Sequence, residues 1–292
     1  MTGVGTPVED ALAAAEMQSR RHDENFPVLF ALLPREQRRH MRVVYAVCRT
    51  IDDLGDQGTP GTTTRLRALD AFADDLDRAW TGTPHHPVLV ALSRTARAAG
   101  LSPEPFHRLI AANRMDQERT RWEDFSDLLD YCRHSATPVG ELVLAVLGVA
   151  DAESVALSDE TCIGLQLVNF WQDIRRDHDE NDRIYLPLRD MEVFGVSESD
   201  IAAPVASRAV RELIAFQTDR ARTHLQAGAP LVARVPRRAR LDIRMFTAAG
   251  LAMCDMIAAQ GHDTLAHRPA PGRRGRVAIA ARVMGRLVRG SR

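Results

Sequence analysis

Apolar residues recur with a helical period in long segments of this chain, and short stretches rich in turn-forming residues separate those segments. A period near 3.6 residues is typical of amphipathic helices. Segments with the strict alternation of a β-strand are nearly absent, so the sequence predicts an all-α fold. Periodicity and breakers together predict helices at 8–22, 35–56, 62–80, 86–99, 103–118, 124–148, 157–179, 206–229, 238–262 and 277–290.

The connections between these segments are too short to link separate domains. They contain turn-forming pairs such as Pro60-Gly61. The sequence has no internal repeat. A length of 292 residues fits one large domain. We therefore predict a single helical domain over residues 1–292, with its core at about 20–268 and a basic tail at 269–292.

The overall charge gives this chain no attraction to nucleic acid, because 38 basic side chains nearly balance 39 acidic ones. The cysteines at 48, 132, 162 and 254 form no CxxC pair, which argues against a disulfide framework and a zinc site. The first residues lack the pattern of a signal peptide, and no apolar run reaches the length of a spanning helix. We expect a cytoplasmic protein that is at most peripheral at the inner face of the membrane.

Three acidic residues gather at the end of the second predicted helix. Asp52 and Asp56 are four residues apart and share a helix face, and Asp53 lies three residues before Asp56. Three carboxylates on one face repel each other unless a cation lies between them. A solvated helix end is the alternative interpretation of this cluster.

A second polar stripe interrupts the predicted helix at 157–179. Gln166, Asn169 and Asp173 lie on one face among apolar neighbours, and Asp177 follows Asp173 by four residues. Polar side chains in an apolar setting need partners. A buried structural network would supply such partners, but a second acid pair with the same spacing favours a metal site.

The chemistry of these side chains indicates magnesium. Oxygen ligands without histidine or cysteine nearby suit Mg²⁺, which is commonly held by carboxylates together with substrate phosphates. We therefore expect a diphosphate substrate. Arg49 precedes the first acid cluster, while Arg183 and Tyr185 follow the second, and each can donate hydrogen bonds to phosphate oxygens. Each of the three taken alone is better explained as an ordinary surface group.

Five sequence motifs carry a resemblance to a known family. The motifs are HDENFPVLFALLP at 22–34, VYAVCRTIDDLGD at 44–56, YCRHSATPVGELVL at 131–144, LVNFWQDIRRD at 167–177 and RIYLP at 183–187. They resemble the squalene/phytoene synthase family, and within it the hydroxysqualene synthases of the bacterial hopanoid pathway. The resemblance implies an all-α isoprenoid synthase fold of the class I terpenoid synthase type, a helical bundle with a central active-site cavity across which the two aspartate motifs face each other.

The same resemblance implies a role for each matched residue. Those implied to hold Mg²⁺ are Asp52, Asp56, Asn169, Asp173 and Asp177, and Asp53 supports the first group. Those implied to contact the diphosphate or its metals are Arg49, Gln166, Asn169, Arg183 and Tyr185. His22 and Phe26 match positions near the first substrate site, where the Phe26 ring could shield a carbocation or simply belong to the core.

Arg133 and Glu141 depart from the family pattern. Arg133 stands where head-to-head condensing members carry a tyrosine that is tied to forming the cyclopropyl intermediate. An arginine there suits a diphosphate that arrives ready-made, so we include Arg133 among the catalytic residues. Glu141 stands where the hopanoid subgroup is expected to carry arginine, and the sequence offers no physical account of it.

The resemblance implies a magnesium-dependent enzyme that converts presqualene diphosphate and water into hydroxysqualene and diphosphate without a reductant. Its pathway partners would be a separate presqualene diphosphate synthase and a downstream dehydrogenase. One alternative is a head-to-head prenyl transferase that uses farnesyl or geranylgeranyl diphosphate to make presqualene diphosphate, squalene or phytoene. A more distant alternative is a non-catalytic isoprenoid-binding relative, although the four principal aspartates are all present.

The stretch at 277–292 alternates apolar residues with arginines. Such a segment could lie on an anionic bilayer, which would suit a greasy substrate. A final core helix with one solvated face explains the same pattern.

Overall fold

The computed structural model describes residues 31–56 and 63–270. Helices make up most of this part of the chain, and its only β-type pairing is one isolated bridge between Arg121 and Ile184. Contacts between Cα atoms divide the chain into two compact units. The first unit joins Met1–Glu118 to Pro138–Val155, and the second joins Arg119–Thr137 to Ala156–Arg292. Each unit is described by itself.

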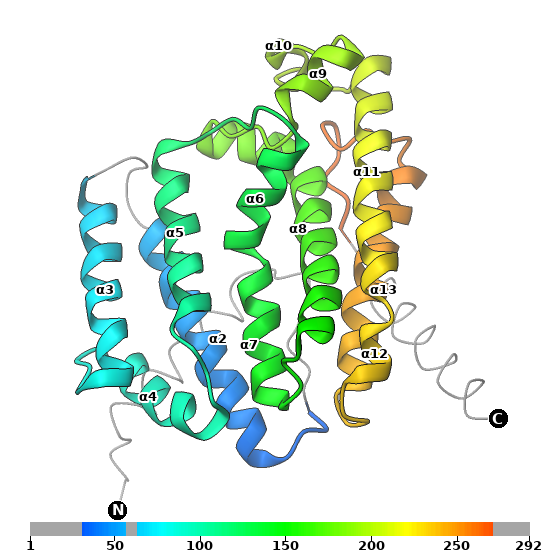
Figure 1. The fold of residues 1–292 in the computed structure, drawn as a ribbon. Coiled ribbons are helices and arrows are strands. Elements are labelled where there is room, and N and C mark those ends of the chain that lie inside the picture. Colours follow the sequence, from blue (N-terminus) through cyan, green and yellow to red (C-terminus); the bar gives the residue numbers. More distant parts are fainter. Residues whose placement is uncertain (1–30, 57–62, 271–292) are drawn as a thin grey trace, which may run out of the picture. The chain divides into compact units, whose positions relative to one another are not determined.

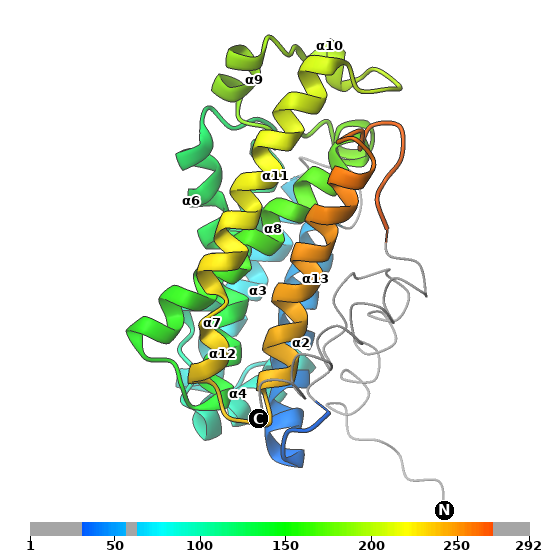
Figure 2. The same cartoon turned by 90° about the vertical axis from the view of Figure 1, so that its right-hand side faces the viewer.

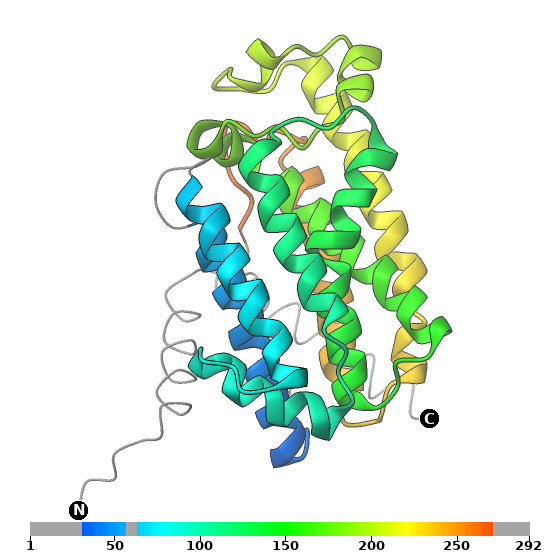
Figure 3. The ribbon, with the colours of Figure 1, turned by 60° about the vertical axis from the view of Figure 1, so that its left-hand side comes forward.

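The first unit is built around α2, which packs against three other helices. Its helices are α2 (Arg35–Asp56), α3 (Thr63–Thr81), α4 (Pro87–Ala99), α5 (Glu104–Glu118) and most of α7 (Thr137–Leu147). In Figures 1 and 3, α3 runs alongside α2 and α4 crosses near one end of the pair. The buried side chains Met41, Val44, Val47 and Ile51 form one stripe along α2, which explains why this helix lies at the centre of the unit.

The second unit contains the longest helix of the described residues. Its helices are α6 (Phe125–Ser135), most of α8 (Ala152–Asn181), α9 (Leu188–Phe194), α10 (Glu198–Ile201), α11 (Arg208–Gly228), α12 (Leu231–Arg234) and α13 (Arg240–Ala259). Figure 2 shows α11 and α13 side by side. A Cβ atom on Gly164 of α8 would lie 2.7 Å from Leu225 Cγ, and one on Gly250 of α13 would lie 2.9 Å from Leu225 Cδ1. These glycines therefore let three helices pack tightly around Leu225 of α11.

The predicted helix at 124–148 is wrong, because the structure breaks it into α6 and α7 at Ala136. The cause is Pro138, which has no backbone N–H and whose ring would clash with the carbonyl of His134 in a continuous helix. The predicted helix at 157–179 is longer in the structure, since α8 begins at Ala152. The Asp151 carboxylate caps this start, accepting hydrogen bonds from the Ser154 backbone and hydroxyl.

Three further expectations have different outcomes. The predicted helices at 8–22 and 277–290 lie outside the described residues. The prediction of one domain over residues 1–292 stays a prediction. Among the described helices, none has the length and apolar character needed to cross a membrane.

Candidate active site

The first acid motif occupies the last two turns of α2, in the first unit. Asp52 and Asp53 are partly exposed, and Asp56 is exposed where the helix ends. Arg49 is four residues before Asp53 and forms an ion pair with it, with 2.8 Å between Nη2 and Oδ1. Arg49 therefore compensates one of the three carboxylates directly.

Asp52 has an unusual electrostatic environment. Burial raises the pKa of Asp52 to about 7, and the neighbouring Asp56 and Asp53 charges act in the same direction. Arg49 and a hydrogen bond from Asn113 lower this pKa but do not restore it to its ordinary value. A further cation beside Asp52 would stabilise its ionised form.

The second acid motif lies on α8, in the second unit. The Asp173 carboxylate is held by the guanidinium of Arg268, whose Nη2 is 3.1 Å from Oδ2 and whose Nε contacts Oδ1. The buried side chain of Gln172 donates a hydrogen bond of 2.6 Å to the carbonyl of Pro269 and fixes the same C-terminal segment. Local sequence patterns do not predict Arg268 as a partner of Asp173, because 95 residues separate the two.

Asp177 is one turn further along α8. Burial raises the pKa of Asp177 to about 7, Asp173 and Glu180 raise it as well, and Arg176 and Arg183 only partly oppose them. The two predicted acid motifs therefore each contain a carboxyl group that is short of positive charge.

The end of α8 places Arg183 near Asp177. Asp182 adopts a left-handed conformation with φ of 51°, and the Arg183 backbone N–H donates to the Asp177 carbonyl at 3.0 Å. Arg121 supports this turn through a 3.0 Å contact with the Asp182 carboxylate. The chain then reverses beside Thr120, whose carbonyl accepts from the Ile184 N–H.

Tyr185 lies in a buried aromatic cluster. Its ring stacks on Phe170 of α8, with centroids 3.8 Å apart and an interplanar angle of 11°. Trp122 also stacks on the Tyr185 ring, with 4.4 Å between ring centroids. The ring centroid of Tyr131 of α6 lies 5.8 Å from that of Tyr185. Phe170 precedes Asp173 by one helical turn, so the cluster continues the face of α8 that carries the acid motif.

The remaining predicted site residues have simpler positions. Gln166 and Asn169 lie on α8 and are partly exposed. Arg133 of α6 is exposed and forms an ion pair of 2.5 Å with Asp130. His22 and Phe26 lie outside the described residues.

The structure supplies a physical account of Glu141. In the first unit, Arg108 of α5 donates from Nη2 to Glu141 Oε1 at 2.5 Å, and its Nε lies 2.8 Å from Glu104. Burial lowers the pKa of Arg108, but the bonds to these two carboxylates outweigh burial and raise it overall. Glu141 therefore acts as the partner of Arg108 in joining α7 to α5.

Among the described residues, no three His, Cys, Asp or Glu side chains lie close enough to hold a metal ion by themselves. Magnesium is more often held by one or two carboxylates together with substrate phosphates. The oxygen-only acid motifs and the raised pKa values of Asp52 and Asp177 fit such a site.

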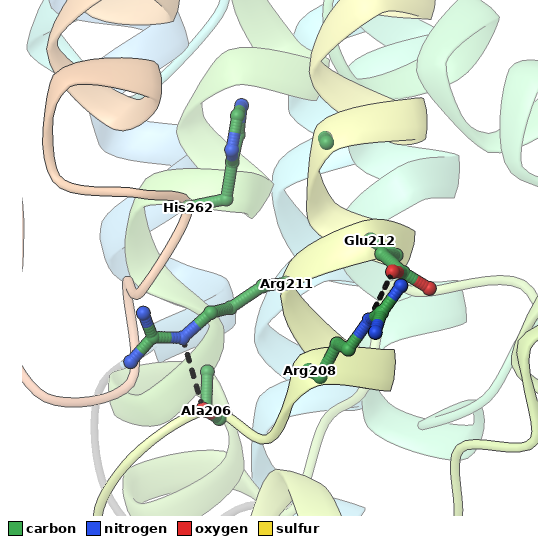
Figure 4. A pocket seen from close by; sticks show the side chains of 6 residues that line it. Ala206, Arg208, Arg211, Glu212 and His262 are labelled. Carbon is green, nitrogen blue, oxygen red and sulfur yellow. Dashed lines mark hydrogen bonds and ion pairs between the residues drawn. The ribbon is translucent and has the colours of Figure 1, made fainter.

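A hollow of about 550 Å³ lies at the start of α11, away from the acid motifs of α8 in sequence. Figure 4 shows Arg211, Arg208 and His262 among its lining residues. Arg208 pairs with Glu212 at 2.7 Å and Arg211 pairs with Asp263 at 2.8 Å. Because these charges already have partners, the hollow supports no assignment of a ligand.

Comparison with known proteins shows the family of this chain. The sequence matches squalene/phytoene synthase over residues 19–279. The chain belongs to the squalene/phytoene synthase family. This is a family of enzymes of isoprenoid biosynthesis that act on prenyl diphosphates. The predicted family is thus confirmed.

Two curated relatives with different activities are similar to this chain to nearly the same degree. A 15-cis-phytoene synthase of Synechocystis is 31% identical over 273 residues, which cover 89% of this chain and 80% of the relative. A hydroxysqualene synthase of Rhodopseudomonas palustris is 33% identical over 226 residues, which cover 76% of each chain. The curated relatives therefore show the family without separating its activities.

Solved structures confirm the predicted fold class. Squalene synthase HpnC from Alicyclobacillus acidocaldarius is 40% identical, with a TM-score of 0.80. The match covers 89% of this chain and 97% of that one. A dehydrosqualene synthase in complex with a ligand is 22% identical, with a TM-score of 0.85 over 97% of this chain and 99% of that one. The protein has the all-α isoprenoid synthase fold.

Proposed function

We propose that this enzyme converts presqualene diphosphate and water into hydroxysqualene and diphosphate. The observation that carries the proposal is Arg133, because the tyrosine that the condensing reaction is expected to need is absent from that position. Hydroxysqualene synthases at 30% to 34% identity are among the relatives and support it, while phytoene synthases at 30% to 36% identity are equally close. Squalene synthase HpnC, at 40% identity, supports a squalene-type synthase.

The reaction breaks the C–O bond to the diphosphate. The cyclopropane then opens through rearranged cations, a water oxygen bonds to the product cation, and that oxygen releases a proton. No reductant enters this balance, which distinguishes it from capture by hydride.

The acid motifs would hold magnesium through Asp52, Asp56, Asn169, Asp173 and Asp177. When bound, magnesium would neutralise the charge that builds on the leaving diphosphate. Arg49, Asp53, Gln166, Arg183 and Tyr185 complete the polar set, as predicted from the sequence. Arg133 would add a further donor for a diphosphate that arrives already formed.

The carbocation needs an apolar surrounding that does not capture it early. The buried stack of Trp122, Tyr185 and Phe170 provides an aromatic surrounding next to the acid-bearing stretch of α8. Ring faces stabilise cations through their negative quadrupole. We propose that this stack shields the cation, together with Phe26.

The second candidate is a head-to-head condensing synthase. Phytoene synthases of Arthrospira platensis and Mycobacterium tuberculosis are 36% and 33% identical, which favours this candidate. We propose a cytoplasmic enzyme that takes its substrate from a separate presqualene diphosphate synthase and passes its product to a dehydrogenase, with peripheral membrane contact.

Product analysis separates the two candidates. Purified enzyme and Mg²⁺ are incubated with presqualene diphosphate or with farnesyl diphosphate, each with and without NADPH, and products are identified by mass spectrometry. Hydroxysqualene from presqualene diphosphate without NADPH supports the proposal. Consumption of farnesyl diphosphate would identify a condensing synthase and make our interpretation of Arg133 wrong.

A further inference from the structure

The last carbonyl groups of α2 are held by side chains from two other helices of the first unit. Gln117 of α5 donates from Nε2 to the Gly55 carbonyl at 3.1 Å and to the Asn113 carbonyl at 3.0 Å. Arg65 of α3 donates to the Gln117 Oε1 at 3.3 Å and also contacts the Asp56 carbonyl. These bonds satisfy carbonyls that have no partner within the helix.

Asn113 brings the same network to the side chain of Asp52. Its amide hydrogen-bonds to the Asp52 carboxylate, and its Nδ2 donates to the Leu109 carbonyl at 3.1 Å. A Cβ atom on Gly55 would lie only 2.0 Å from Asn113 Oδ1. The Asn113 amide therefore rests directly on the α2 backbone between Asp52 and Asp56.

The end of α2 differs from the end of α4 in the groups that hold it. In the same unit, α4 ends at Gly100 in the left-handed conformation, and the backbone N–H of Gly100 donates to the Ala96 carbonyl. The end of α2 instead buries the Arg65 side chain, which is 6% exposed. Burying a guanidinium is costly unless its bonds are well formed. The network thus fixes the orientation of the α2 end more tightly than helix termination requires.

We propose that Asn113, Gln117 and Arg65 are positioning residues that orient Asp52 and Asp56 for a divalent cation bound with diphosphate. The inference rests on the proposed function of the first acid motif. Asn113 acts on the Asp52 carboxylate, and Gln117 and Arg65 act on the backbone that carries Asp56. Hydrogen bonds of this kind commonly change metal affinity by about 10- to 100-fold.

Gln117→Leu tests the proposal, with Gln37→Leu as the matched control. Gln37 belongs to the first turn of α2 and donates from Nε2 to the Val146 carbonyl at 3.3 Å, so it makes the same type of bond at the opposite end of the helix. Binding of Mn²⁺ in the presence of inorganic diphosphate is titrated for each protein, and thermal unfolding is recorded alongside.

We expect Gln117→Leu to weaken Mn²⁺ binding about tenfold. Gln37→Leu should lose comparable stability but keep the same Mn²⁺ affinity as the wild type. Asn113→Ala, which only removes atoms, should weaken binding in the same direction and provides a second variant if Gln117→Leu fails to fold. Normal Mn²⁺ affinity in folded Gln117→Leu and Asn113→Ala would overturn the inference.

Asp52→Asn separates this failure from failure of the proposed function. If Asp52→Asn weakens Mn²⁺ binding while the Gln117 and Asn113 variants do not, the metal assignment stands and only the positioning role is wrong. If Asp52→Asn binds Mn²⁺ normally, the metal assignment fails and the positioning role fails with it.

Discussion

The guanidinium of Arg268 holds the carboxylate of Asp173 through two nitrogen–oxygen contacts, one of them 3.1 Å long. A guanidinium and a metal cation compete for the same carboxylate oxygens. We therefore predict that Arg268→Gln increases Mn²⁺ affinity roughly fivefold, the equivalent of about 1 kcal/mol for a partly exposed ion pair. Titration with Mn²⁺ measures this affinity in the wild type and the variant.

Arg176→Gln is the matched control for Arg268→Gln. Its guanidinium lies 4.0 Å from the same carboxylate and its side chain is 56% exposed, so it competes weakly. Equal effects of the two variants would show that only general charge matters, which would contradict the specific role of Arg268.

The second prediction concerns Glu141. Removing it deprives the partly buried Arg108 of the nearer of these two carboxylates and leaves Glu104, whose side chain is 61% exposed. We expect Glu141→Ala to lower the free energy of unfolding by about 1 to 2 kcal/mol, and Glu104→Ala to lower it by less. Urea unfolding of both variants tests this. A larger loss in Glu104→Ala would contradict our account of Glu141.

The third prediction concerns acid stability and Asp75 of α3. Burial would raise the pKa of Asp75, but bonds from the His86 and His85 backbone, the His85 ring and Arg78 outweigh burial and lower it from 3.8 to about 2. Because the pKa of Asp75 is lower in the folded state than in the unfolded state, its ionised carboxylate stabilises the protein above pH 4. This stabilisation is lost as the pH falls towards 2. The shift corresponds to about 2 kcal/mol.

Asp75→Asn should therefore remove this part of the acid dependence, so that wild type and variant converge in stability as the pH falls from about 4 to 2. Asp77→Asn is the control, because Asp77 is 61% exposed and forms an ion pair with the partly exposed His107. Urea unfolding across this pH range is the measurement. A constant stability difference between wild type and Asp75→Asn would refute the prediction.

The fourth prediction concerns the tight contact of α8 with α11. A Cβ on Gly164 would lie 2.7 Å from Leu225 Cγ and 2.9 Å from the Leu225 backbone nitrogen, which cannot easily move. We expect Gly164→Ala to cost about 1 to 3 kcal/mol of stability through overpacking. Gly82→Ala, where a Cβ meets no atom within 4 Å, should be nearly neutral. A neutral Gly164→Ala would mean that these helices are less tightly packed than described.

Local sequence patterns predicted several helices to within one residue. The predicted segments 35–56, 86–99 and 103–118 differ from α2, α4 and α5 by at most one residue at either end. The short helices α9, α10 and α12 were missed, because four to seven residues are too few to show a helical period.

The candidate site was predictable only where it is local. The spacing of Asp52 and Asp56, and of Asp173 and Asp177, placed each pair on one helix face. The partners that hold them were not predictable, because Arg268 is 95 residues from Asp173 and Gln117 is 62 residues from Gly55. Such contacts depend on tertiary packing, and nothing in the local sequence marks them.

The most direct test of the proposed reaction follows the oxygen atom of the product. The enzyme is incubated with Mg²⁺ and presqualene diphosphate in water labelled with the heavy oxygen isotope, without NADPH, and the product is analysed by mass spectrometry. Capture of the carbocation by water predicts hydroxysqualene that carries the heavy isotope in its hydroxyl group. An alcohol without the label, formed by cleavage at phosphorus, or a product made only with NADPH, would contradict the account.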